Sequence, residues 1–110
     1  MNVSFDYDGT MLHVNHLVER FQRFGDEIFI VTSRVESKNN HNDLFEEAMD
    51  LGIKRENIYF TNNEIKLSKL EELNINLHFD DDSVEVDEIN RYSQTCKALL
   101  VNFKQCYSND

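Results

Sequence analysis

The sequence predicts an α/β fold in which a parallel sheet of five strands carries helices on both faces. Strand-like and helix-like apolar patterns alternate along the 110 residues, and such alternation is typical of a parallel sheet. Residues 28–31 (Ile-Phe-Ile-Val) are apolar at every position, which favours a strand buried on both faces. The connections are short and the chain contains no proline and three glycines, so residues 1–110 are expected to form a single domain.

Each element follows from its own apolar pattern. The expected strands are residues 3–5, 28–31, 57–60, 75–79 and 98–101. The expected helices are residues 14–24, 44–51, 65–73 and a fourth that begins near Asp82 or Ser83. Gly25 and Gly52 are placed to end the first two helices, and Asn42 or Asp43 is a possible cap at the start of the second. The last seven or so residues are expected to form a tail.

One strand departs from the pattern of a central parallel strand. In residues 75–79 the polar Asn76 and His78 alternate with apolar residues, whereas such a strand is usually apolar on both sides. A histidine on a buried strand is most often hydrogen-bonded within the core, and we interpret His78 in that way.

The net charge and the composition of the chain disfavour some classes of function. The chain has 11 Lys plus Arg against 21 Asp plus Glu, a formal net charge of −10, which disfavours binding to nucleic acid. A phosphorylated substrate would also be repelled unless a cation occupied the site. There is no apolar stretch of membrane-spanning length and no signal-peptide pattern. We therefore expect no membrane association, a cytoplasmic location, and free thiols at Cys96 and Cys106.

Residues that could take part in binding or catalysis follow the ends of the expected strands. They are Asp6, Asp8, Gly9 and Thr10 after the first strand, Thr32, Ser33 and Arg34 after the second, Lys66 and Lys69 near the third helix, and Asp80, Asp81 and Asp82 after the fourth strand. Ligands of parallel sheets bind outside the carboxyl ends of the strands, so we expect these groups to converge at one edge. Arg34 is interpreted as a surface arginine.

These segments resemble the motifs of the haloacid dehalogenase-like (HAD) phosphohydrolases. The resemblance runs from Phe5 to about Val101. It is carried by Phe-Asp-Tyr-Asp-Gly-Thr at 5–10, by Ile-Phe-Ile-Val-Thr-Ser at 28–33, by a lysine near position 66, and by His-Phe-Asp-Asp-Asp at 78–82. It implies a three-layer αβα, Rossmann-like, doubly wound sheet with strand order 5-4-1-2-3. It also implies a Mg²⁺-dependent phosphomonoesterase that acts through an aspartyl-phosphate.

The resemblance assigns a role to each motif residue. Asp6 would be the nucleophile, Asp8 the general acid and base, and Gly9 would let the chain turn away from the phosphate. The phosphate would be bound by Gly9, Thr10, Thr32 and Ser33, and its charge offset by Lys66, or by Lys69 as the alternative. Carboxylates beside a phosphate require a hard cation. The expected Mg²⁺ ligands are Asp6, the Asp8 carbonyl and Asp81, with Asp80 in support, although the choice among Asp80, Asp81 and Asp82 stays open.

The gaps between the motifs leave no room for a cap domain. A capless member has an open site, which in this family goes with bulky or macromolecular phosphorylated substrates, or with an oligomer or partner chain that closes the site. Two other functions remain possible: a catalytically idle HAD-fold binding module, and a receiver-like phospho-acceptor domain. The receiver is disfavoured because residues 61–63 (Thr-Asn-Asn) supply no carboxylate after the third strand. A calcium loop starting at Asp6 is excluded because its twelfth position is Leu17.

Overall fold

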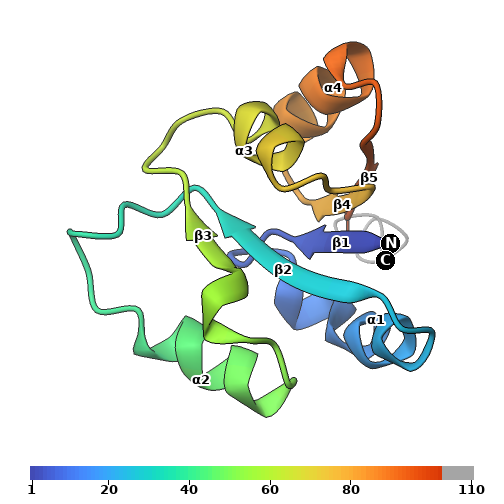
Figure 1. Ribbon diagram of the computed structural model, residues 1–110. Helices are drawn as coiled ribbons and strands as arrows, with labels where there is room; N and C mark the ends of the chain where they lie inside the picture. The colour runs from blue at the N-terminus through green and yellow to red at the C-terminus, as the bar shows by residue number, and fades with distance from the viewer. Residues whose placement is uncertain (103–110) are drawn as a thin grey trace, which may run out of the picture.

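The computed structural model describes residues 1–102. It contains a five-stranded sheet in which every neighbouring pair of strands is parallel, in the order β3-β2-β1-β4-β5 (Figure 1). The strands are β1 (Asn2–Phe5), β2 (Glu27–Thr32), β3 (Ile58–Phe60), β4 (Leu77–Asp80) and β5 (Lys97–Leu100). Read from the other edge, this is the predicted order 5-4-1-2-3. The predicted fold class is confirmed.

Helices cover both faces of the sheet. They are α1 (Met11–Arg23), α2 (Asn42–Asp50), α3 (Leu67–Glu72) and α4 (Ser83–Tyr92), with a short 3-10 helix at Arg55–Asn57. Helices α1 and α2 lie on one face and α3 and α4 on the other (Figure 1). Side chains alternate between the faces of a strand, so Ile28 and Ile30 pack with α1 and α2, whereas Phe29 and Val31 pack with α3 and α4. The apolar run 28–31 is therefore a strand buried on both faces, as predicted.

Several element boundaries differ from those predicted. Strand β4 is Leu77–Asp80 rather than 75–79, and α1 begins at Met11 rather than near residue 14. The residue that precedes α2 is His41, so neither Asn42 nor Asp43 caps this helix, and the Asp43 carboxylate is bound to Arg34 instead. Helix α3 is shorter than predicted. The expected tail, the last seven or so residues, lies outside the described residues.

The cap of α4 is as predicted. The Asp82 carboxylate accepts hydrogen bonds from the backbone N–H groups of Val84 at 2.9 Å and Glu85 at 3.4 Å. Such a cap satisfies N–H groups that have no partner within the helix. It also fixes the first turn of α4 beside the carboxyl end of β4, where the sequence placed its acidic residues.

The connections at the carboxyl edge of the sheet are short. In the described chain the longest segment between successive elements is residues 33–41, between β2 and α2. No segment within residues 1–102 holds an inserted cap domain. No helix in this part of the chain is long and apolar enough to cross a membrane.

Candidate active site

A hollow of about 360 Å³ opens at the carboxyl edge of the sheet. It is lined by six of the predicted site residues: Asp6, Asp8, Ser33, Lys66, Asp80 and Asp81. Further acidic groups, Glu64, Asp82, Glu85 and Glu88, and two apolar side chains, Ile65 and Val84, also line it. The strand ends thus bring together residues as distant in the sequence as Asp6 and Asp81, which are 75 positions apart.

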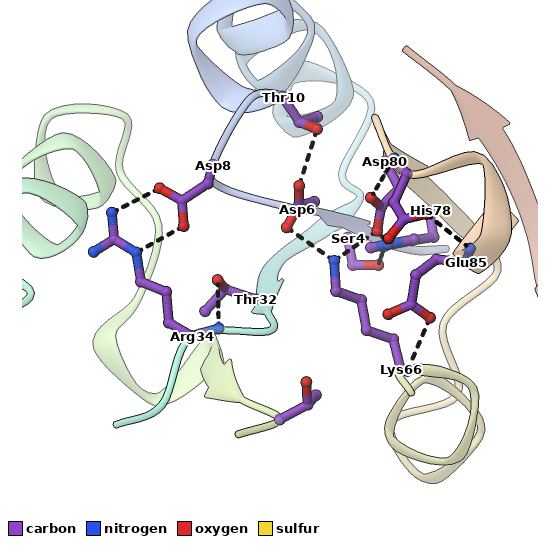
Figure 2. Close-up of polar contacts among 12 residues, drawn as sticks. Ser4, Asp6, Asp8, Thr10, Thr32, Arg34, Lys66, His78, Asp80 and Glu85 are labelled. Atoms are coloured by element: carbon purple, nitrogen blue, oxygen red, sulfur yellow. Dashed lines mark hydrogen bonds and ion pairs between the residues drawn. The ribbon is translucent and has the colours of Figure 1, made fainter. Parts of the chain in front are cut away.

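A buried lysine joins two carboxylates at the base of this hollow. Lys66 Nζ lies 2.8 Å from Asp6 Oδ1 and 2.6 Å from Asp80 Oδ2, and its side chain is only 2% exposed (Figure 2). Lys66 immediately precedes α3, which places its side chain across the end of the sheet. Lys69, the alternative lysine, lies one turn further on and instead binds Glu72 and faces the Tyr59 ring. Geometry therefore selects Lys66.

The electrostatics of this cluster follow from two carboxylates sharing one ammonium in a buried place. Burial raises the pKa of Asp6 from 3.8 to about 7, with Asp80 adding to the rise and Lys66 opposing it. Burial alone would also raise the pKa of Asp80, but its hydrogen bond from His78 and the Lys66 charge hold it below the usual value. Burial would lower the pKa of Lys66, yet the two carboxylates raise it. Asp80 is therefore the carboxylate that stays ionised, whereas Asp6 is the one whose protonation changes more readily.

The residues that follow Asp6 shape its surroundings. The Thr10 hydroxyl is buried and donates to Asp6 Oδ2 at 3.1 Å, so it orients the carboxylate rather than lining the hollow. Gly9 has a φ of +77°, and a Cβ there would collide with the Asp81 carboxylate oxygen and lie 3.0 Å from its Cγ. Glycine thus suits the backbone turn, and it leaves room for the Asp81 carboxylate, which would have to move for a side chain at this position.

Asp8 is oriented differently from Asp6. Its carboxylate takes a bidentate pair of hydrogen bonds from Arg34, Nε and Nη2 each at 2.8 Å, and the same guanidinium binds Asp43. The Arg34 side chain is 18% exposed and lies over the Tyr7 ring. Arg34 is thus a partly exposed arginine held by two carboxylates, a pairing that its interpretation as a surface arginine did not include. Its position two residues past Thr32 was the available signal, because β2 is the neighbour of β1 in the sheet.

The hydroxyls after β2 split between two places. Thr32 is buried, and its Oγ1 accepts from the Arg34 backbone N–H at 3.2 Å, whereas Ser33 lines the hollow. Thr32 lies between Asp6 and Arg34 (Figure 2). Its hydroxyl oxygen supports the turn that carries Arg34, and its O–H proton is not used in this hydrogen bond.

Two contacts of the cluster were not identified from the sequence. Glu85, in the first turn of α4, accepts from the Lys66 backbone N–H at 3.1 Å, and burial raises the pKa of its carboxyl. His78, correctly interpreted as a hydrogen-bonded core histidine, donates its bond to Asp80 itself. The signal for Glu85 was its place three residues past the Asp82 cap, on a helix that starts at this edge.

The acidic residues offer a place for a hard cation. Carboxylate oxygens of Asp6, Asp80 and Asp81 lie within 4.8 Å of one another, and oxygen-only donors are those that Mg²⁺ prefers. The Asp8 carboxylate is outside this group because it faces Arg34. Comparison with known proteins adds no identification, since no family model and no curated protein matches the chain. The conclusions on function therefore depend on this geometry and on the motifs.

Proposed function

We propose that this chain is a Mg²⁺-dependent phosphomonoesterase of the HAD type that acts through an aspartyl-phosphate on Asp6. One observation carries the proposal: a buried Asp6–Lys66–Asp80 cluster lies at the base of a hollow, with the Asp81 carboxylate beside it. One carboxylate would suffice to offset the charge of one buried lysine. A second buried carboxylate, with its pKa raised to about 7, costs stability and is typical of a functional group.

In the first step an oxygen of Asp6 attacks the phosphorus of the substrate, and the bond from phosphorus to the leaving oxygen breaks. Lys66 and Thr10 hold the Asp6 carboxylate in place. The Ser33 side chain lines the hollow where the phosphoryl oxygens would lie. Such preorganised contacts are usually the largest contribution to catalysis of phosphoryl transfer.

Asp8 supplies and removes the proton. It would protonate the leaving oxygen, then take a proton from the water that attacks the phospho-Asp6 and releases inorganic phosphate. In this structure its carboxylate faces Arg34, so the step requires rotation of the Asp8 side chain away from the guanidinium. About 60% of the Asp8 side chain is exposed, which leaves it room to rotate.

Asp6, Asp81 and the Asp8 backbone carbonyl would hold the Mg²⁺, with Asp80 in support. Mg²⁺, when bound, would offset the negative charge of the phosphate beside these carboxylates. Its charge would also favour the ionised form of Asp6, the form that attacks phosphorus. Within residues 1–102 no inserted domain covers the hollow, which suits a bulky phosphorylated substrate or a site completed by another chain.

The test is to trap the covalent intermediate. Wild type, Asp6→Asn and Asp8→Asn are incubated with a phosphomonoester labelled in its phosphoryl group, and bound label is measured after acid quenching. We expect label in Asp8→Asn that hydroxylamine releases, as for an acyl phosphate, and none in Asp6→Asn. Absence of label from Asp8→Asn, with the Mg²⁺ present and turnover detected in wild type, would contradict the proposed intermediate.

A further inference from the structure

A fully buried hydrogen-bond chain lies beneath the acidic cluster. Ser4 and His78 are direct neighbours on β1 and β4, and both are 0% exposed. Ser4 Oγ lies 2.6 Å from His78 Nδ1, and His78 Nε2 lies 2.8 Å from Asp80 Oδ2 (Figure 2). Two polar residues on neighbouring inner strands of the sheet thus form a line that ends at the carboxylate bound by Lys66.

The donor and the acceptor of each hydrogen bond between Ser4, His78 and Asp80 can be assigned from the Asp80 carboxylate. An ionised carboxylate can only accept hydrogen bonds, so Nε2 of His78 must carry the proton. A neutral imidazole has a proton on one ring nitrogen alone. Its Nδ1 then has only a lone pair, and the Ser4 hydroxyl must donate to it. With a neutral imidazole, Ser4, His78 and Asp80 therefore form one consistent line of donors and acceptors.

His78 completes a three-point restraint on Asp80. Asp80 Oδ2 accepts from Lys66 Nζ at 2.6 Å and from His78, while Oδ1 accepts from the backbone N–H of Asp82 at 3.0 Å. These donors come from the start of α3, from β4 and from the cap of α4. Together they fix the rotation of the carboxylate and leave one lone pair of Oδ1 without a bond from these three donors.

We infer that His78 is a positioning residue for the cation site, acting through Asp80. It sets the orientation of the Asp80 carboxylate and thereby the place of the Lys66 ammonium between Asp80 and Asp6. The Asp80 carboxylate sets the tautomer of His78, and the Ser4 hydroxyl, which donates to Nδ1, holds the orientation of the ring. The inference rests on the cation site of the proposed function. Partners of this kind behind a metal-binding carboxylate are typically worth 10- to 100-fold in metal affinity.

Two amide substitutions separate the two bonds of the imidazole. The amide nitrogen of His78→Gln occupies nearly the position of Nε2 and can donate to Asp80. The amide of His78→Asn occupies the position of Nδ1, so it can bond Ser4 but does not reach Asp80. His78→Leu removes both bonds. Asn57→Ala is the control, because Asn57 is another buried polar residue whose side chain bonds Glu27 and Ile28, outside the hollow.

The affinity of each variant for Mn²⁺ is measured by electron paramagnetic resonance, which needs no turnover. We expect His78→Gln to bind within about threefold of wild type, and His78→Asn and His78→Leu to lose about tenfold or more. Asn57→Ala should lose stability without losing affinity. A ¹⁵N spectrum of the wild-type imidazole should show protonation at Nε2 alone.

The failures are distinguishable. Wild type that binds Mn²⁺, with equal affinity in His78→Gln and His78→Asn, would overturn the positioning role and leave the proposed function intact. The expected order of affinities, without phospho-enzyme in the trapping experiment, would support the positioning role and count against the phosphatase. Wild type that binds no Mn²⁺ would overturn both. If His78→Leu does not fold, the comparison of the Gln and Asn variants decides.

Discussion

Asp6→Asn should make the fold more stable while it abolishes the proposed chemistry. In the folded chain the pKa of Asp6 is raised by burial from 3.8 to about 7. The folded state therefore binds more protons than the unfolded state between these pH values, so stability falls as pH rises through this window. Above pH 7, the raised pKa of Asp6 lowers the free energy of unfolding of wild type by about 4 kcal/mol.

Asp6→Asn regains only part of this free energy of unfolding. An asparagine oxygen can still accept from Lys66 or Thr10, but it no longer has the charge that partly offsets Lys66. We expect Asp6→Asn to be about 1–3 kcal/mol more stable than wild type at pH 8 and equal to it near pH 4.

Urea unfolding at pH 4.5, 6 and 8 measures the difference between the two chains. Mg²⁺ supplies a second check, because a cation that binds the folded state at 100 times its Kd stabilises by about 2.7 kcal/mol, and this gain should appear in wild type and shrink in Asp6→Asn. The reasoning would be refuted if the two pH dependences were parallel, or if the variant were less stable than wild type at pH 8.

Two further predictions compare matched residues. Gly9→Ala and Gly25→Ala place a side chain at similar positive φ values, +77° and +84°, and each should cost about 1–2 kcal/mol in unfolding free energy. Only at Gly9 does the new Cβ meet the Asp81 carboxylate, so only Gly9→Ala should lower Mn²⁺ affinity, by about tenfold or more. Equal Mn²⁺ affinities of Gly9→Ala and Gly25→Ala would show that Asp81 is not part of the cation site. Lys66→Met leaves two buried carboxylates without their ammonium and should destabilise by about 3–5 kcal/mol, whereas Lys69→Met, which breaks a partly exposed pair with Glu72, should stay within about 0.5 kcal/mol. Similar losses in the two lysine variants, measured by urea unfolding, would contradict the burial argument.

The fold could be predicted because local patterns determine it. The apolar run 28–31 indicates a strand buried on both faces, and Gly25 and Gly52 follow the first two helices with positive φ, as their helix-ending role requires. Element limits were less predictable where tertiary contacts override local preference. Asp43 is a good N-cap residue by type, but Arg34 binds its carboxylate and lowers its pKa to about 2.

The site could be predicted as a set of residues but not as a set of contacts. The place of Asp6, Asp80 and Asp81 around one hollow follows from their positions at strand ends, and that of Lys66 from its position at the start of α3. The pairing of Asp8 with Arg34 spans 26 residues and that of Ser4 with His78 spans 74, so each depends on which strands are neighbours. The alternation of polar residues in β4, a misfit by local pattern, becomes intelligible once β1 lies beside it.

Hydrolysis of p-nitrophenyl phosphate, with and without Mg²⁺, tests the central claim most directly when wild type is compared with Asp6→Asn. We predict turnover in wild type that requires the cation, and no turnover in a folded Asp6→Asn. Turnover retained in Asp6→Asn would contradict the role of Asp6 as the nucleophile.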